Sequence, residues 1–176
     1  MIEKDFTLLE IITYGHPVLK QKAQEIKNIT EDLKNIAANM VYTMHSSPGI
    51  GLAAPQINQS IRLITADLSV GEKKDDLLVL INPEITYWEG NKVMEEGCLS
   101  IPEINENVNR PAQIVLKGYN LNEKELEISA EGLLARVLCH EVDHLNGILF
   151  IEHLSPLKKS LIKKKLKKHL QKEEIL

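Results

Sequence analysis

The sequence has little that would suit a secreted or a membrane protein. Its 176 residues include only two cysteines, Cys98 and Cys139, so no disulfide framework is implied. The most apolar short stretch, residues 77–81, is far below the roughly 20 residues that a membrane-spanning helix needs. The N-terminus is charged, and no signal-like apolar segment follows it. We therefore expect a cytoplasmic protein without a membrane partner.

Acidic residues are scarce only at the C-terminal end. Residues 155–176 carry eight lysines and two glutamates, a net charge of +6, whereas the other 154 residues carry a net charge of −10. The main body therefore repels nucleic acid on average, and we expect no DNA partner. Any polyanionic partner would have to bind the lysine-rich tail.

Hydrophobic periodicity predicts one helix followed by several strands. Residues 30–45 place apolar side chains at steps of three and four, with Thr30 as N-cap and Pro48 and Gly49 as the stop. A turn-rich link at residues 120–123 predicts an antiparallel pairing of the two strands beside it. The predicted strands are residues 61–65, 77–81, 85–88, 114–119 and 126–129.

Two further segments return to helical spacing. Residues 131–145 predict a helix that Gly147 ends, and Ser155 and Pro156 are typical of the start of another. Strands in succession, rather than in alternation with helices, favour an α+β fold. We expect a single domain over residues 1–176, with antiparallel strands packed around the 131–145 helix and a basic C-terminal helical tail at 155–176. The apolar positions of that tail are Leu157, Leu161, Ile162, Leu166 and Leu170.

The 131–145 helix contains an H-E-x-x-H string made by His140, Glu141 and His144. The two imidazoles leave the same helix face one turn apart, so they can bind one metal ion. Glu141 lies close enough for its carboxylate to reach a water on that metal without being a ligand. Flanking apolar residues indicate a core helix, in which a charged cluster needs a partner. The alternative is a surface helix with two solvated histidines.

Cys98 lies in a segment, residues 96–100, that has no helical pattern. Its thiolate could complete a site of two histidines and one cysteine that leaves a coordination position open for water. An open position distinguishes a catalytic metal from a structural one. Without the H-E-x-x-H string, Cys98 would more often be a buried small hydrophobe.

A third string, residues 49–56, has glycines at alternate positions followed by two alanines, and it ends in Gln56. Such backbone allows close approach by another chain or by substrate, and Gln56 is its only side chain able to hydrogen-bond. The spacing lacks both glycine patterns of nucleotide-binding loops, which argues against a nucleotide ligand.

In this order, the three strings resemble the signature motifs of peptide deformylases, which remove the formyl group from the N-terminal methionine of new bacterial and organellar proteins. The resemblance extends from residues 14–19 through Arg110 to residues 149–151, and so covers most of residues 10–155. It implies a metal-dependent hydrolase in which a metal-bound water attacks the formyl carbonyl of N-formylmethionyl nascent peptides.

The resemblance also implies roles for single residues. The metal ligands would be Cys98, His140 and His144. Glu141 would be the general base and acid, while Gln56 and the Leu99 backbone N–H would stabilise the oxyanion. A thiolate is a softer ligand than a carboxylate, so we expect one divalent metal ion, Fe²⁺ in the cell with Zn²⁺ or another divalent ion as the alternative. The substrate-binding residues would be Ile50, Gly51, Glu96, Gly97, Arg110 and Val137.

Two features concern positions outside these roles. The family usually has glutamine where this chain has Cys139, which on an ideal helix points about 100° from His140 and about 140° from His144. We therefore expect Cys139 to pack rather than to bind metal. In some bacterial members a C-terminal helix docks on the ribosome, which implies a ribosome partner for the lysine-rich tail. The alternative is a helix that packs its leucines on the domain and leaves its lysines in water.

Two other functions remain open from the sequence. A zinc endopeptidase shares H-E-x-x-H and needs a third ligand further along, for which His153 is available, but the glycine-containing pattern of metzincins is missing. A non-catalytic metal-containing protein that binds RNA or the ribosome would need four protein ligands and no Glu141.

Overall fold

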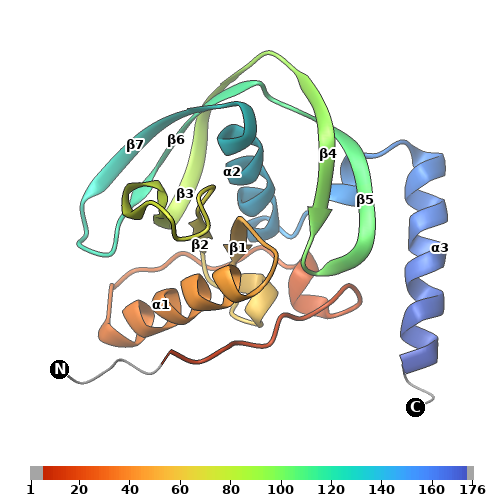
Figure 1. Cartoon of the computed structure of the whole chain (residues 1–176), viewed down its shortest axis with the longest axis horizontal. Coiled ribbons are helices and arrows are strands. Elements are labelled where there is room, and N and C mark those ends of the chain that lie inside the picture. Colours follow the sequence, from red (N-terminus) through yellow and green to blue (C-terminus); the bar gives the residue numbers. More distant parts are fainter. Residues whose placement is uncertain (1–5, 174–176) are drawn as a thin grey trace.

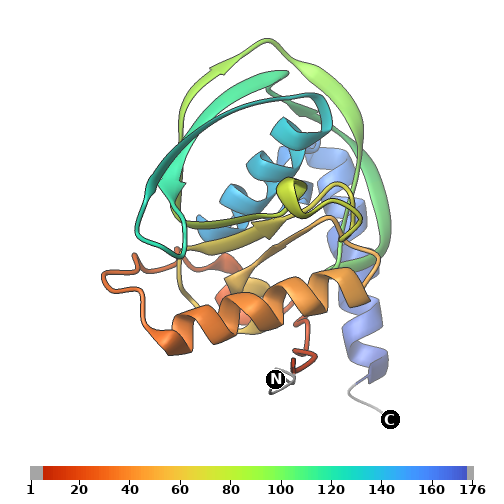
Figure 2. The same cartoon turned by 60° about the vertical axis from the view of Figure 1, so that its left-hand side comes forward.

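Two antiparallel sheets surround one helix in the computed structural model of the chain, which describes residues 6–173 and the side chains of residues 6–168 (Figure 1). The larger sheet has the strand order β1 (Gly51–Ala53), β2 (Leu63–Ala66), β3 (Leu78–Glu89), β6 (Gln113–Tyr119) and β7 (Glu125–Glu131). The smaller sheet is the hairpin of β4 (Lys92–Cys98) and β5 (Ile101–Arg110). Helix α2 (Gly132–Leu145) lies between them (Figure 2). The predicted α+β fold is confirmed.

Strand β2 explains how the larger sheet is covered on both faces. Ile64 and Ala66 belong to the core cluster that includes Leu138 of α2, whereas Leu63 packs in the cluster of helix α1 (Glu31–Ser46). All four residues of β2 are buried. Because successive strand residues point to opposite faces, an apolar strand of this kind is covered on both sides. At β2 the sheet is therefore packed between α1 and α2.

The predicted N-terminal helix is confirmed as α1. Thr30 is its N-cap, because the Leu33 backbone N–H donates to Thr30 Oγ1 at 3.2 Å. Glu31 and Asp32 stand in the first turn, where negative charge stabilises the positive end of the helix dipole. The helix ends at Ser46, two residues before Pro48.

The runs at residues 77–81 and 85–88, predicted as two strands, form the single strand β3. Asn82 has a positive φ of 50°, and the pairing of β3 with β6 shifts register between Ile81 and Glu84. The Asn82 side chain donates to the Ile26 carbonyl at 2.8 Å and accepts from the Ile26 N–H at 2.9 Å. This bulge interrupts the hydrophobic pattern without ending the strand. The predicted antiparallel hairpin of β6 and β7 is confirmed.

Three strands lack enough hydrophobic pattern to be predicted, namely β1, β4 and β5. In β5 the residues that are buried are Ile101, Ile104, Val108 and Arg110, and most of the others are exposed and polar. Such a strand has weak propensity of its own and is held by its partner β4 and by the core beneath it. The unpredicted hairpin carries Cys98 at the end of β4.

Helix α2 is a core helix, as predicted, and ten of its residues are buried. Gly147 ends this segment with a positive φ of 72°. A Cβ at this position would lie 2.6 Å from both the carbonyl carbon and the oxygen of Lys20, so only glycine fits here. The short 3₁₀ helices that connect the chain are η1 (Pro17–Lys20), η2 (Ala54–Ile57), η3 (Lys74–Asp76) and η4 (Phe150–His153).

The lysine-rich tail forms helix α3 (Pro156–Glu173), which stands beside β5 at the edge of the molecule (Figure 1). Ile162 and Leu166 are buried in the core cluster of η4 and β5, but Leu157 and Leu161 are 71% and 61% exposed. The alternative in which the tail packs its leucines on the domain therefore does not hold for Leu157 and Leu161, and Leu157 and Ile162 point about 140° apart on a helix. Leu170 lies outside the described side chains. Within residues 6–173, no helix is long and apolar enough to cross a membrane.

Candidate active site

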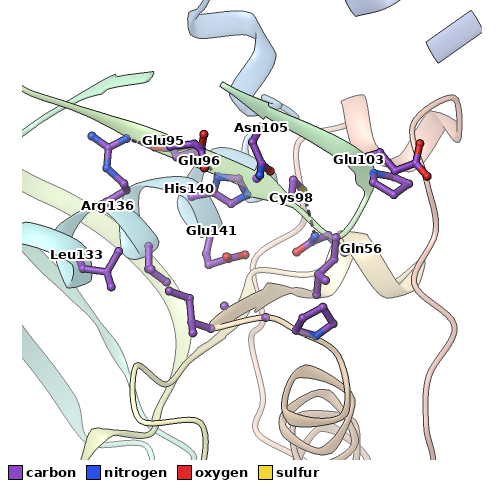
Figure 3. Close-up of a pocket in the computed structure, with 18 residues that line it drawn as sticks. Gln56, Glu95, Glu96, Cys98, Glu103, Asn105, Leu133, Arg136, His140 and Glu141 are labelled. Carbon is purple, nitrogen blue, oxygen red and sulfur yellow. Dashed lines mark hydrogen bonds and ion pairs between the residues drawn. The ribbon is translucent and has the colours of Figure 1, made fainter. Parts of the chain in front are cut away.

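A cavity of about 470 Å³ opens between α2, the β4–β5 hairpin and the segment that leads into β1 (Figure 3). Helix α2 supplies Leu133, Arg136, Val137, His140 and Glu141. The other lining residues are Pro48, Gly49, Ile50, Gly51, Gln56, Glu95, Glu96, Gly97, Cys98, Leu99, Pro102, Glu103 and Asn105. Segments far apart in the sequence therefore meet here, and each of the three sequence strings contributes to the wall.

Three clustered side chains could hold a metal ion; Cys98 and His140 line the cavity, whereas His144 is not part of its lining. One ligand atom each of Cys98, His140 and His144 lies within 4.8 Å of the other two. The Cys98 sulfur is 3.3 Å from His144 Nε2, and the two imidazole rings meet edge to face at 4.9 Å. Thiolate and imidazole are ligands that suit zinc and iron, and a set of three leaves a fourth position open. The donor set and spacing therefore fit one divalent ion.

Glu96 orients His140 from behind. Its carboxylate accepts from Arg110 Nε and Nη2 at 2.9 and 3.0 Å, from Arg136 Nη1, and from His140 Nδ1 at 3.1 Å. Burial raises the pKa of Glu96, but the hydrogen bonds from His140 and Arg110 outweigh it and lower the pKa to about 2. A carboxylate can only accept, so His140 Nδ1 must donate and Nε2 is left for a metal. The ring of Phe150 stacks on His140 at 6.1 Å.

The pKa values of the two histidines are shifted in opposite directions. Burial lowers the pKa of His144 well below 6.5, which keeps this imidazole neutral, as a ligand must be. Burial also lowers the pKa of His140, but hydrogen bonds to Cys98 and Glu96 outweigh it and raise the pKa well above 6.5, so a metal ion that binds His140 has to displace a proton. His144 Nδ1 is buried and has no hydrogen-bond partner among residues 6–168.

Hydrogen bonds hold the buried side-chain amide of Gln56 in one orientation. The Ala53 backbone N–H donates to Gln56 Oε1 at 2.8 Å, which leaves the amide nitrogen on the opposite side. Gln56 Nε2 donates to Ser100 Oγ at 3.3 Å and to the Cys98 sulfur at 3.6 Å. Gln56 therefore presents a hydrogen-bond donor beside the three potential ligands.

Glu141 points into the cavity between the ligands and β1 (Figure 3). Its Oε2 is buried without a hydrogen-bond partner among the described side chains, and burial raises its pKa to about 7. A buried polar atom without a partner is rare in proteins, and it suits a site that receives a water or a substrate group. A carboxyl group with this pKa can both accept and return a proton near neutral pH.

The remaining predicted residues lie around the cavity, with one exception. Ile50, Gly97, Leu99 and Val137 line its wall. A Cβ at Gly97 would lie 2.4 Å from Asn105 Oδ1, so any side chain at this position would have to displace the side chain of Asn105. Arg110, expected at the rim of a methionine pocket, is instead buried behind Glu96 and does not line this cavity.

Several lining residues belong to no sequence motif, among them Arg136, Leu133 and Asn105. Arg136 and Leu133 stand four and seven residues before His140, so helical spacing alone could have placed them on the same face. Asn105 lies on β5, which has no predictive pattern, and no signal could have found it. Arg136 also donates to the carbonyl oxygens of residues 92, 94 and 108, which ties the β4–β5 hairpin to α2.

Comparison with known proteins identifies this arrangement. The family model for polypeptide deformylase matches residues 8–160. The chain belongs to the peptide deformylase family. A peptide deformylase from Thermodesulfovibrio yellowstonii is 51% identical over 160 residues, which are 91% of this chain and 97% of that protein. One from Syntrophobacter fumaroxidans is 47% identical over 164 residues, 93% of this chain and 96% of that protein.

Solved peptide deformylases have the same fold. The Legionella pneumophila enzyme has a TM-score of 0.88 at 38% identity, with 96% of this chain and 98% of that chain covered. The Synechococcus elongatus enzyme, solved in complex with actinonin, has a TM-score of 0.84 at 38% identity, with 89% of this chain and 86% of that chain covered. This chain is therefore an enzyme that removes N-formyl groups from nascent peptides, as the resemblance predicted.

The structure also argues against the two alternative functions, a zinc endopeptidase and a non-catalytic metal-containing protein. His153, the third ligand that an endopeptidase would require, bonds to Asp143 Oδ2 at 2.6 Å and is not among the three clustered ligands. A structural metal would need four protein ligands, but the cluster among the described residues has three, and the other cysteine, Cys139, packs among buried apolar residues. Burial raises the pKa of its thiol to about 11, which disfavours the thiolate that a metal needs.

Proposed function

We propose that Cys98, His140 and His144 hold one divalent metal ion, Fe²⁺ in the cell with Zn²⁺ or another divalent ion as the alternative. The supporting observations are the close approach of the three ligand atoms and the Glu96 contact that frees His140 Nε2. When bound, the ion supplies Lewis acidity, which lowers the pKa of a water and polarises a carbonyl group. A soft sulfur ligand is compatible with iron.

Glu141 moves the protons of the reaction, and its partnerless buried oxygen is the observation that carries the proposal. The carboxylate accepts a proton from the attacking water and returns it to the nitrogen that leaves as the amine. Because Glu141 points into the cavity from the same helix as two of the ligands, it reaches the reacting atoms without binding metal.

Gln56 and the backbone N–H of Leu99 stabilise the oxyanion that forms on the formyl carbonyl. The support for Gln56 is its locked amide, which directs Nε2 toward Cys98. Leu99 follows Cys98 directly and lines the cavity. Donors that are in place before the reaction need no rearrangement when the negative charge develops, which is why they lower the barrier.

The substrate enters along the backbone of Ile50, Gly51 and Gly97, and its methionine side chain lies against Val137 and Glu96. The support is that all five residues line one cavity, and that a side chain at either glycine would collide with its neighbours. The Synechococcus elongatus relative was solved with actinonin, and we propose that this compound occupies the same cavity here.

The decisive experiment replaces Glu141 with glutamine, which has the same shape but cannot take up a proton. Hydrolysis of formyl-Met-Ala-Ser should fall by roughly 10²–10⁴-fold, while metal content stays equal to that of the wild type. Glu95→Gln is the matched control, because Glu95 is an exposed residue of the cavity rim, and it should remain active. Near-normal activity of Glu141→Gln would refute the assigned role.

We also propose that helix α3 binds the ribosome and that the enzyme works in the cytoplasm, where formylated chains emerge. Lys159, Lys163, Lys164, Lys167 and Lys168 line one surface hollow of about 620 Å³. Lys159 and Lys163 pair with Glu152, whereas no ion pair is found for the other three among the described side chains. Ribosomal RNA would bind such a surface through release of counterions.

The tail proposal is tested by charge removal rather than by truncation. Truncation after Pro156 would also remove the buried Ile162 and Leu166 and would expose the core beneath them. Replacement of Lys164, Lys167 and Lys168 by glutamine should weaken ribosome co-sedimentation, and the remaining binding should depend less on salt. The matched control replaces Lys73, Lys74 and Lys92. Unchanged co-sedimentation of the tail variant would leave its lysines as solvated residues only.

A further inference from the structure

A chain of charged contacts runs away from the metal ligand His140 and ends at His153. His140 Nδ1 donates to Glu96, both oxygens of Glu96 accept from Arg110, and Arg110 Nη1 donates to Asp143 Oδ2. His153 Nε2 lies 2.6 Å from the same Asp143 oxygen. Asp143 belongs to α2, one turn after His140, whereas His153 is the last residue of η4.

The contacts around Asp143 define the role of His153. Its Nε2 is 2.6 Å from Asp143 Oδ2 and 3.1 Å from Arg110 Nη1, which is always a donor. One ring nitrogen cannot donate to Asp143 and accept from Arg110 at once. Because the distance to Asp143 is the shorter one, His153 Nε2 donates to Asp143. Asp143 Oδ2 therefore accepts from both His153 and Arg110.

This arrangement leaves Arg110 no freedom. Its Nε and Nη2 bind Glu96, its Nη1 binds Asp143, and only 3% of its side chain is exposed. The Glu96 carboxylate in turn accepts four hydrogen bonds, so it cannot rotate without breaking the one from His140. An outer partner of a ligand sets the orientation and basicity of that ligand. A displacement of Arg110 would therefore be transmitted to the imidazole.

We propose that Asp143 and His153 form a positioning pair that, through Arg110 and Glu96, sets the orientation of the metal ligand His140. His153 is 35% exposed and lines a second cavity of about 580 Å³ together with Arg110 and Asp143, but it does not line the substrate cavity. A change at His153 therefore reaches the metal without altering a substrate contact. The inference rests on the proposed metal site.

The test compares the full-length, metal-loaded wild type with His153→Leu and His153→Gln. Leucine removes the donor to Asp143, and glutamine keeps one. We expect a chelator to remove Zn²⁺ from His153→Leu about three- to tenfold faster than from the wild type, below the 10–100-fold effect typical of a direct partner of a ligand. His153→Gln should be within about twofold of the wild type. The visible spectrum of the Co²⁺ form should shift in His153→Leu alone, and kcat should fall without a change in KM.

His45→Leu is the matched control, since it breaks another histidine–aspartate pair, with Asp67 at 2.9 Å, that has no contact with a metal ligand. If His153→Leu does not fold, Asp143→Asn, which keeps the shape but removes the charge, is judged by the same criteria. An unchanged dissociation rate and spectrum in a folded variant overturn the positioning role alone. A wild type that binds no zinc overturns the metal-site proposal as well.

Discussion

Gly51 and Glu141 are in contact in the lining of the cavity that we propose for the substrate. A Cβ placed on Gly51 would lie 2.3 Å from Glu141 Oε1 and 2.9 Å from Val137 Cγ1. The position of the Glu141 carboxylate therefore depends on the absence of a side chain at Gly51, the first residue of β1. The colliding atom is the end of a flexible side chain, so the collision moves Glu141 more readily than it unfolds the protein.

Gly51→Ala should therefore reduce activity and leave metal and fold intact. A displacement of about 1 Å at a reacting group can cost roughly 100-fold in rate, and we expect a fall in kcat of that order. Metal content and the midpoint of thermal unfolding should stay near those of the wild type. Activity within threefold of the wild type would show that Glu141 tolerates the added methyl group.

The two cysteines should respond differently to alanine. Cys98→Ala removes one of three ligands, so metal and activity should be lost together. Cys139→Ala should keep stoichiometric metal and lose only about 1 kcal/mol of stability, because this thiol is buried in the core and stays protonated. Metal analysis and urea unfolding of both variants test this. Equal metal loss in the two proteins would contradict the assignment of Cys98.

Gln56→Leu should separate catalysis from substrate binding. Loss of a donor to an oxyanion typically costs 10²–10³-fold in kcat, and KM for formyl-Met-Ala-Ser should change little. The Ala53 N–H also loses its acceptor, so stability should fall by roughly 1–3 kcal/mol. Steady-state kinetics at a temperature where the variant is folded would decide. A raised KM with normal kcat would assign Gln56 to ground-state binding instead.

Asp67 should make the protein sensitive to acid. Burial raises its pKa, but hydrogen bonds from Ser69, Gly71 and His45 outweigh it and hold the pKa below 3.8. The stabilisation is therefore present above pH 3.8 and is lost as pH falls through the lower, folded-state value. At pH 7, Asp67→Asn should be less stable than the wild type by roughly 2 kcal/mol, the usual size for hydrogen bonds to a charged group.

The difference in stability between the wild type and Asp67→Asn should be smaller at pH 3, where the wild-type Asp67 carboxyl group also begins to be neutral. Urea unfolding of both proteins, stripped of metal, at pH 7, 5 and 3 measures it. Asp75→Asn is the control, since Asp75 is exposed on η3 and makes no such contacts. A pH-independent difference would mean that Asp67 acts through shape rather than charge.

The sequence predicts the catalytic helix well and the opposite wall poorly. His140 and His144 belong to one helix, so a local spacing places them together. The meeting of Cys98 with them depends on the β4–β5 hairpin, whose exposed, polar residues carry no strand pattern. The local pattern made Cys98 only a candidate third ligand, and the family resemblance assigned it to the site.

The charged contacts behind the site are the part that sequence could not supply. Nothing in the spacing of Glu96, Arg110 and Asp143 indicates that they share a network, because the pairs are 14 to 47 residues apart and their meeting depends on the tertiary fold. Arg110 was expected at the substrate and is found bound to Glu96, behind the proposed ligand His140. The single-domain organisation and the roles of individual site residues stay predictions.

The pairing of β4 with β5 has a consequence for how the enzyme can misfold. Cys98 and Glu96, two positions apart on β4, both contact α2: the Cys98 sulfur lies 3.3 Å from His144 Nε2, and a Glu96 oxygen lies 3.1 Å from His140 Nδ1. A slip of one residue between the strands would turn both outward and replace them with Glu95 and Gly97. Such a conformer could bind no metal, so metal occupancy itself reports whether this hairpin has its correct register.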